Sequence, residues 1–355
     1  MNESSGPPRR PYTTKDPLTD AKIAEMASRM EDEQDRRLVA ELITSAVRLG
    51  AEKASTIDLK IINSAVKELR YAFKLFRPYR RVKKVATFGS ARVSGDHPAY
   101  RMAKEFGRLM AKAGWMVITG AASGIMKAGH EGAGREASFG LNIRLPFEQG
   151  ANPIIARDKK LISCKYFFTR KLLFIKESHA TALFAGGFGT LDEGFESLTL
   201  VQTGKSDPRP IVFVDPPRKR FWEPLLDFMN NRLVREGMIS PSDRAIYRVA
   251  RSAEEAADII LKFYSVYHSM RYVGPWMVIR LQRPLPLRTI QLLNREFKDI
   301  IVSGEITQGP ALDEEVDEPD LALLTRLIFQ FNRKDFGRLN QLIGRINQSA
   351  DQPAR

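Results

Sequence analysis

The stretch from Thr181 to Lys205 constrains the fold more than any other part of the chain. It reads Thr-Ala-Leu-Phe-Ala-Gly-Gly-Phe-Gly-Thr-Leu-Asp-Glu-Gly-Phe-Glu-Ser-Leu-Thr-Leu-Val-Gln-Thr-Gly-Lys. Its first five residues, 181–185, are an apolar run that predicts a buried strand. The glycines of Gly186-Gly187-Phe188-Gly189 then permit a sharp turn with positive φ. Apolar residues between 191 and 198 recur at helical spacing, which predicts a helix that ends at Gly204.

A strand, a glycine turn and a helix together aim free backbone N–H groups and a helix dipole at an anion, so the stretch predicts a phosphate-binding loop. Two simpler interpretations stay open. The glycines also suit a strand that enters a helix closely. Thr190 and Glu193 match a capping box, in which Glu193 accepts a hydrogen bond from the Thr190 N–H. The loop lacks the third spaced glycine of a dinucleotide fingerprint and the Lys-Ser/Thr of a Walker A loop.

Length and composition indicate a soluble protein of about two domains, because 355 residues exceed the usual size of one. A hydrophobic content of 43% is enough to build a core. No run approaches the length of a membrane span, and the polar N-terminus does not resemble a signal sequence. The single cysteine, Cys164, excludes an internal disulfide. We therefore expect a cytoplasmic protein without a membrane partner.

The net charge of +14 favours an anionic partner. Lys and Arg are spread along the predicted helices, and no zinc pattern or RNP-like motif occurs. A basic surface also suits an enzyme that attracts a phosphate-bearing small molecule. Small nucleotides explain the charge as well as a nucleic acid does, and a nucleic-acid partner is the less favoured interpretation.

Strands and helices alternate through the middle of the chain. We expect strands at 83–88, 115–119, 139–145, 181–185 and 211–214, and helices at 100–112, from 125, at 166–177 and at 221–236. This order implies an α/β fold with a Rossmann-like, doubly wound and mostly parallel sheet. Ligands of such sheets bind beyond the carboxyl ends of the strands. Three turns of small residues fall there: Gly89-Ser90-Ala91-Arg92, Gly120-Ala121-Ala122-Ser123-Gly124 and the loop at 186–189.

The rest of the chain flanks this domain. We expect a disordered tail at 1–18, a helical extension at 19–80 with helices at 20–49 and 57–76, the nucleotide-binding catalytic domain at 81–266, and a small α+β domain at 267–350. In the last of these we expect strands at 276–281, 304–307 and 327–331, and helices at 287–300 and 336–346. No catalytic constellation occurs in it, so an assembly or regulatory role is favoured.

Two motifs of the central domain are similar to those of a known family. Residues 167–171 read Phe-Phe-Thr-Arg-Lys, and residues 186–193 read Gly-Gly-Phe-Gly-Thr-Leu-Asp-Glu. Together they resemble the lonely-guy family of nucleoside-monophosphate phosphoribohydrolases, long mislabelled as lysine decarboxylases. The similarity runs from about residue 83 to residue 264 and includes the segments 140–149 and 198–205.

The resemblance implies hydrolysis of the N-glycosidic bond of a nucleoside 5′-monophosphate, AMP or an N6-modified relative, to free base and ribose 5-phosphate. Arg170 and Glu193 would be the catalytic pair. The substrate would be held by Lys171, Gly186, Gly187, Phe188, Gly189, Thr190 and Thr199, with Ser90, Gly120, Ser123 and Gly124 from the other turns. The resemblance also implies a homodimer or larger homo-oligomer. No metal or redox cofactor is expected, because the four histidines show no ligand spacing.

The sequence departs from the family pattern near the second turn. Ala121 and Ala122 stand in a turn that is richer in glycine in relatives, where they would crowd a phosphate or change the path of the backbone. Lys127 stands where relatives carry an acid, and Ala185 replaces a proline before the glycine loop. These changes keep a second interpretation open, a nucleotide-binding sensor without catalysis on the same fold. A nucleic-acid-binding protein is the third.

Overall fold

The computed structural model describes residues 12–144, 150–217 and 220–349. Contacts divide the chain into one unit up to Arg70 and a second from Tyr71 onward. Each unit is described by itself. Residues 1–11 of the expected tail and the segment 145–149, which belongs to the family resemblance, lie outside the described residues. Among the described residues no helix has both the length and the apolar character needed to cross a bilayer.

The first unit consists of α1 (Pro17–Ala27), α2 (Glu33–Ala51) and most of α3 (Thr56–Phe76). The helical segment expected at 20–49 is divided into two helices at residues 28–32, at the start of its charged stretch. Asp32 causes the break, because its side chain accepts a hydrogen bond from the Asp35 N–H and starts a new helix. Asp16 caps α1 in the same way, so this helix begins inside the segment expected to lack fixed structure.

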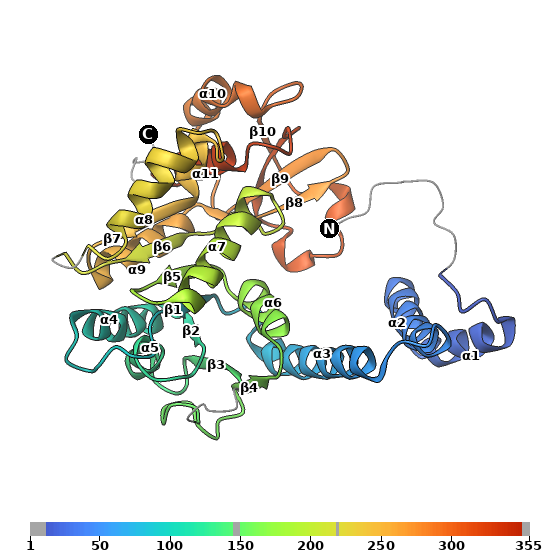
Figure 1. Ribbon diagram of the computed structural model, residues 1–355. Coiled ribbons are helices and arrows are strands. Elements are labelled where there is room, and N and C mark those ends of the chain that lie inside the picture. The colour runs from blue at the N-terminus through green and yellow to red at the C-terminus, as the bar shows by residue number, and fades with distance from the viewer. Residues whose placement is uncertain (1–11, 145–149, 218–219, 350–355) are drawn as a thin grey trace. The chain divides into compact units, whose positions relative to one another are not determined.

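The second unit contains a parallel sheet of seven strands in the order β4-β3-β2-β1-β5-β6-β7 (Figure 1). Its strands are β1 (Lys84–Phe88), β2 (Met116–Thr119), β3 (Ser138–Ile143), β4 (Leu161–Cys164), β5 (Ala180–Leu183), β6 (Ile211–Val214) and β7 (Tyr247–Ala250). Its main helices are α4 (Pro98–Lys112), α5 (Ile125–Ala133), α6 (Phe167–Glu177), α7 (Phe188–Gln202), α8 (Glu223–Phe228) and α9 (Ala253–Phe263). The expected doubly wound α/β fold is confirmed.

Alternation along the strands places helices on both faces of this sheet. Val85 of β1 belongs to a core cluster with residues of α4, α5 and α9. Phe88, three residues further along β1, points to the opposite face and contacts Phe174 of α6, with ring centroids 4.7 Å apart. On that same face Phe76 at the end of α3 stacks on Phe139 of β3 at 4.3 Å. The end of α3 is thus part of the core of the second unit.

The predictions missed β4, β7 and α9. They also gave one helix and one strand bounds that differ from those of the structure. The helix expected at 221–236 is α8 followed by a π-helical segment, Met229–Val234. The strand expected at 139–145 ends at Ile143. Both missed strands lie at the edges of the sheet, and only two of the four residues in each are fully buried. Such strands lack the continuous apolar run that marks a central parallel strand.

The C-terminal domain has an antiparallel sheet of four strands in the order β10-β11-β9-β8. Its elements are β8 (Tyr267–Val273), β9 (Trp276–Leu281), α10 (Leu287–Glu296), β10 (Thr307–Gly309), β11 (Thr325–Phe329) and α11 (Phe336–Gln348). The α+β character is confirmed, although β8 was not predicted. Arg280 and Arg326 are buried in this sheet, and both bond Glu315 of the acidic loop, with N–O distances of 2.7 and 3.1 Å.

Removal of the Phe76 side chain should destabilise the second unit. The Phe76→Ala change leaves a cavity against Phe139, and a change of this kind in a core costs about 3–5 kcal/mol. Phe73→Ala on the same helix is the matched control, because Phe73 is 39% exposed and should cost less than about 1 kcal/mol. Urea unfolding of both variants measures the difference. Equal losses would contradict the placement of α3.

Candidate functional site

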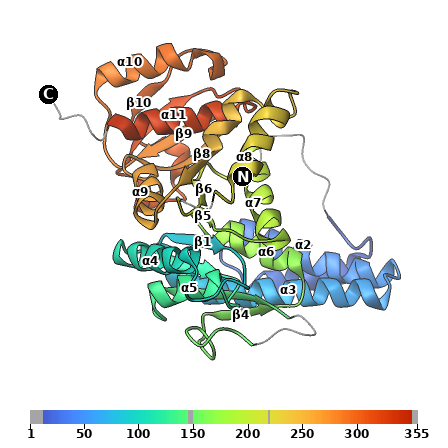
Figure 2. The ribbon, with the colours of Figure 1, turned by 60° about the vertical axis from the view of Figure 1, so that its left-hand side comes forward.

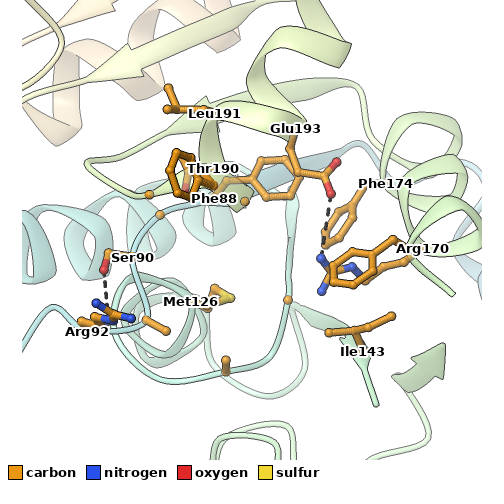
Figure 3. Close-up of a pocket in the computed structure, with 18 residues that line it drawn as sticks. Phe88, Ser90, Arg92, Met126, Ile143, Arg170, Phe174, Thr190, Leu191 and Glu193 are labelled. Atoms are coloured by element: carbon orange, nitrogen blue, oxygen red, sulfur yellow. Dashed lines mark hydrogen bonds and ion pairs between the residues drawn. The ribbon is translucent and has the colours of Figure 1, made fainter. Parts of the chain in front are cut away.

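A cavity of about 610 Å³ lies beyond the carboxyl ends of β1, β2 and β3, between the start of α7 and one side of α6 (Figure 3). All three turns predicted from small residues contribute to it. Its lining residues are Phe88, Gly89, Ser90, Ala91, Arg92, Gly120, Ala122, Met126, Ile143, Phe167, Arg170, Phe174, Gly187, Phe188, Gly189, Thr190, Leu191 and Glu193.

The glycine loop turns without positive φ, contrary to the prediction. The positive-φ glycines of the described chain do not include those at 186, 187 and 189. Gly186 is required by close packing instead, since a Cβ there would lie 2.1 Å from the Thr190 Oγ1 and 3.0 Å from the Ser90 N. The capping-box interpretation is wrong as well. Helix α7 begins at Phe188, so Thr190 already lies in its first turn and is not the cap.

The start of α7 is open toward the cavity. Its cap residue is Gly187, which provides no side chain, and the Gly187 carbonyl accepts the N–H groups of Thr190 and Leu191. The N–H groups of Phe188 and Gly189 precede these and have no acceptor within the helix. A Cβ added at Gly187 or Gly189 would meet nothing within 4 Å. The protein's own packing does not explain these two glycines, but a ligand at the N-terminus of the helix would.

The second turn takes a path that keeps one of its alanines out of the cavity. Ala121 has a φ of 62° and is fully buried, whereas Ala122 lines the cavity. Gly124 also has positive φ, and a Cβ there would lie 2.2 Å from the Ser90 carbonyl oxygen. The expectation that both alanines crowd a phosphate is therefore wrong for Ala121, which is buried and does not line the cavity.

A buried histidine and an asparagine fix this path. The Asn152 amide donates hydrogen bonds to the carbonyl oxygens of Ala121 and Ala122, at 3.0 and 3.1 Å. His130 lies beside it, with 3.1 Å between its Nδ1 and the Asn152 Nδ2. Burial lowers the pKa of His130 to about 4, so the ring is neutral at physiological pH. His130 supports the turn and carries no charge to a ligand.

Glu193 is the buried acid of the cavity. Its side chain is 3% exposed, and neither carboxylate oxygen has a hydrogen-bond partner within the described part of the chain. The Arg170 guanidinium faces it, with 4.0 Å between Nη2 and Oε1 (Figure 3). The Lys171 Nζ lies 3.6 Å from the other oxygen, Oε2. The carboxylate is thus close to two cations but hydrogen-bonded to neither.

Burial raises the pKa of Glu193 to about 7, although Lys171 and Arg170 act in the opposite direction. Lys171 has other partners, since its Nζ lies 2.8 Å from Asp192 and 2.9 Å from Glu196. Burial alone would lower the pKa of Lys171, but these hydrogen bonds outweigh it and raise that pKa. Lys171 therefore stays charged beside Glu193, while Glu193 is divided between its two protonation states near neutral pH.

Arg170 is held by aromatic rings. Its guanidinium carbon lies 4.9 Å from the ring centre of Phe167 and 5.9 Å from that of Phe174. Both rings also line the cavity, so they fix the guanidinium while they shield it from water. This arrangement leaves a positive group next to the buried acid without a tight ion pair between them.

The structure brings together most of the residues predicted for the site. Arg170, Glu193, Gly187, Phe188, Gly189, Thr190, Ser90 and Gly120 line the cavity. Lys171, Gly186, Thr199, Ser123 and Gly124 do not. The first two of these support lining residues, as described above. The Ser123 hydroxyl donates to the Ala91 carbonyl oxygen, and the Thr199 hydroxyl donates to that of Phe195 on the exposed side of α7.

Sequence reasoning missed a second cation and an apolar wall. Arg92 lines the cavity after β1, and its N–H donates to the Ser90 Oγ at 3.1 Å. Figure 3 shows Arg92 and Arg170 on opposite sides of the cavity, with Met126 between them. Met126 of α5 and Ile143 at the end of β3 add apolar side chains to the lining. The only available signal was position, since each follows or ends a strand of the parallel sheet.

The cavity combines features that suit an anionic ligand with an apolar part. It has an open helix N-terminus for an anion, two arginines, an apolar wall and a buried acid with a pKa near 7. The fold and these residues define an α/β protein with a candidate nucleotide site at the carboxyl edge of the sheet.

Comparison with known proteins identifies the domain. Residues 119–260 match the model of a family described as "Possible lysine decarboxylase". The chain carries a domain of this family, as the motifs at 167–171 and 186–193 predict. It is 37% identical over 100 residues to a probable cytokinin riboside 5′-monophosphate phosphoribohydrolase of Oryza sativa subsp. japonica. It is 37% identical over 86 residues to a cytokinin riboside 5′-monophosphate phosphoribohydrolase of Arabidopsis thaliana.

These similarities are partial. The two alignments cover 28% and 24% of this chain, and they span only 44% and 38% of the respective relatives. Among solved structures, the molybdenum cofactor carrier protein of Chlamydomonas reinhardtii is 20% identical with a TM-score of 0.36, over 51% of this chain and 98% of that one. DNA processing protein A of Helicobacter pylori is 17% identical with a TM-score of 0.31, over 51% and 80%. TM-scores this low support no conclusion about function.

Burial of Glu193 should make the stability of the fold depend on pH. Because its folded pKa of about 7 exceeds the ordinary 4.5, its contribution to stability is complete below pH 4.5 and is lost as the pH rises through 7. Relative to Glu193→Gln, the native chain should lose about 3 kcal/mol between these limits. Urea unfolding of both chains near pH 5 and pH 8 measures the loss. A difference that does not change with pH would show that Glu193 titrates normally.

Proposed function

We propose that this protein hydrolyses the N-glycosidic bond of a nucleoside 5′-monophosphate, AMP or an N6-modified AMP, to free base and ribose 5-phosphate. One observation carries the proposal. Glu193, a buried carboxylate that accepts no hydrogen bond from the described residues, lies in the same cavity as the open N-terminus of α7 and the Arg170 guanidinium. Similarity to plant phosphoribohydrolases over part of the chain supports the same reaction.

The lining residues suit the three parts of such a substrate. The phosphate binds at the N–H groups of Phe188 and Gly189, where the helix dipole favours negative charge. Arg170 binds oxygen atoms of the ribose phosphate with its planar guanidinium. The base lies against the apolar side chains of Met126 and Ile143. Binding of the phosphate and base thus holds the glycosidic bond beside Glu193.

The reaction breaks the bond between the ribose C1′ and the base nitrogen. Positive charge develops on the ribose ring, as in other glycoside hydrolyses. The Glu193 carboxylate stabilises this charge, or it accepts a proton from the attacking water. Water supplies a hydroxyl group to C1′ and a proton to the departing base, so no oxidant or reductant is needed. Lys171 keeps the carboxylate in place through its contacts with the acids of α7.

The reaction should depend on Glu193 and not on an acid outside the cavity. Glu193→Gln should lower kcat/KM for AMP about 10²–10⁴-fold, because the transition state loses its carboxylate. Glu105→Gln, on α4 and outside the cavity, is the matched control and should keep most of the activity, because its carboxylate pairs with Arg108 on the surface. Release of adenine and ribose 5-phosphate from AMP, followed by chromatography, measures both. In the native chain kcat/KM should rise with pH through about 7; a fall over that range would mean that the protonated acid is the active form.

The same assay separates the hydrolase from the two alternatives. Binding of AMP without release of adenine would support a nucleotide sensor, an interpretation favoured by the altered turn at Ala121. A nucleic-acid-binding protein would instead bind long DNA or RNA with a steep salt dependence, and AMP would not compete. The net charge of +14 is the observation that favours this last alternative.

Gly189 should be needed for the ligand and not for the fold. A Cβ there meets no protein atom within 4 Å and lies in the first turn of α7, so Gly189→Ala should leave the free energy of unfolding unchanged or raise it by up to about 1 kcal/mol. The methyl group enters the space proposed for the phosphate, so KM for AMP should rise about tenfold or more. Thermal unfolding and steady-state kinetics measure the two effects. An unchanged KM would place the phosphate elsewhere.

The homodimer stays a prediction. Phe167, Phe168 and Leu172 of α6 are about half exposed. An exposed apolar face of this kind is typical of a protein–protein contact. We propose self-association through this face.

A further inference from the structure

Arg92 is a cation of the candidate active site to which neither motif gives a role. It follows β1 in the first of the three turns and lines the cavity of about 610 Å³. Figure 3 shows Ser90 and Arg92 on one side of this cavity and Arg170 with Glu193 on the other. The two arginines therefore face different parts of a ligand that fills the cavity.

The backbone of this first turn is held on both sides. The Ser90 N–H donates to the Ala185 carbonyl oxygen at 3.0 Å, which ties the turn to the glycine loop before α7. The Ser90 carbonyl oxygen accepts the Ile125 N–H at 3.0 Å, and the Ala91 carbonyl oxygen accepts the Ser123 hydroxyl at 2.8 Å. The first turn is thus fixed relative to the two turns beside it.

Packing of the helices that follow the turns adds to this rigidity. Helices α4 and α5, which follow the first and second turns, lie side by side against the sheet (Figure 2). They approach so closely that a Cβ at Gly107 of α4 would lie 2.3 Å from the carbonyl oxygen of Gly129 of α5. Because the backbone is already fixed, only the freedom of the Arg92 side chain itself is lost when it binds a ligand.

The Arg92 guanidinium is available to a ligand. Its side chain is exposed and forms no ion pair with any residue that the structure describes. Arg101 of α4 is exposed as well, but its Nη1 donates to the Asp96 carbonyl oxygen at 2.7 Å, and it lies outside the cavity. Arg92 thus combines a charge without an ionic partner and a place in the cavity lining.

An anion is favoured on the Arg92 side of the cavity. The first turn contacts the glycine loop, since a Cβ at Gly186 would lie 3.0 Å from the Ser90 N. That loop leads into the open N-terminus of α7, where the N–H groups of Phe188 and Gly189 favour negative charge. Arg92 adds a full positive charge and a planar guanidinium that matches phosphate oxygens.

The Arg170 side of the cavity suits a phosphate less well. The Arg170 Nη2 lies 4.0 Å from the Glu193 Oε1, so a phosphate held there would lie close to the carboxylate. Burial already raises the pKa of Glu193 to about 7, and the repulsion between like charges would raise it further. A phosphate at Arg92 avoids this repulsion and leaves Arg170 to the ribose oxygens.

We propose that Arg92, together with the N–H groups of Phe188 and Gly189, binds the 5′-phosphate of the ligand, while Arg170 binds its ribose. This assignment rests on the proposed function in that it takes the ligand to be a nucleoside monophosphate. It makes Arg92 the residue that selects phosphorylated nucleosides over free nucleosides, because a free nucleoside has no anion for the guanidinium to bind.

Binding of AMP and of adenosine tests the assignment. Isothermal titration would use chains that carry Glu193→Gln, so that hydrolysis is slow. Adding Arg92→Ala should raise the dissociation constant for AMP about tenfold or more and that for adenosine less than about twofold, because only AMP loses a charge-assisted hydrogen bond. Arg92→Lys should recover part of the affinity for AMP, since it restores the charge without the fork. Arg101→Ala, which removes an exposed arginine outside the cavity, is the matched control and should change neither constant.

A loss of affinity for AMP alone supports the assignment. Equal losses for AMP and adenosine, an unchanged affinity for AMP, or an equal effect of Arg101→Ala overturns it. Thermal unfolding is the second readout, for the case that adenosine binds too weakly to titrate. A loss of AMP binding that comes with a lower unfolding temperature in Arg92→Ala would mean a structural role and would also overturn the assignment.

The assignment and the proposed reaction fail in different ways. AMP binding that depends on Arg92, without release of adenine by the native chain, would contradict the hydrolase and keep the assignment. Release of adenine by the native chain, with the same preference for AMP over adenosine after Arg92→Ala, would contradict the assignment and keep the hydrolase. A chain that binds no AMP overturns the assignment, and release of adenine by the native chain still decides the reaction.

Discussion

The candidate active site depends on the burial of one carboxylate between two helices. Glu193 projects from α7, and the cations nearest to it, Arg170 and Lys171, are consecutive residues of α6. Removing a carboxylate from water costs several kcal/mol unless charges or hydrogen bonds compensate. Here compensation is partial, because the nearest cation lies 3.6 Å away and no hydrogen bond is formed within the described chain. The remaining cost appears as a pKa near 7, the value that suits proton transfer at neutral pH.

The two adjacent cations have different functions because successive residues of a helix point in different directions. Lys171 turns toward Asp192 and Glu196, so its charge is used within the protein to hold α6 against α7. Arg170 turns toward the cavity, where rings support it and its polar atoms can reach a ligand. The Arg-Lys pair therefore couples the position of Glu193 to the position of the group that would bind substrate.

Sequence reasoning placed those strands correctly that are marked by a continuous run of apolar residues. Central strands such as β6 are continuous apolar runs and were placed correctly, whereas the edge strands β4 and β7 carry polar residues and were missed. The two motifs identified Arg170 and Glu193 as candidate site residues. They did not show how deeply the two side chains are buried or how far apart they lie. The turns that carry Arg92 and precede Met126 were placed at the correct edge of the sheet, but these two side chains were not assigned to the site, because no motif marks them. The path of the second turn depends on Asn152, some thirty residues away, and local sequence does not show such a contact.

Helix α6 connects the candidate active site to the opposite edge of the sheet. Its first half carries the cations beside Glu193, and its last turn is held by Arg209 through two backbone carbonyl oxygens. A helix is stiff along its axis, so a shift at one end moves the other. At 4.0 Å the Arg170–Glu193 distance is already at the limit of an ion pair. A small displacement of α6 would therefore change both the field at Glu193 and the reach of Arg170. Arg209 caps this helix at its far end, so contacts at the opposite edge of the sheet help to set the position of the cations beside Glu193.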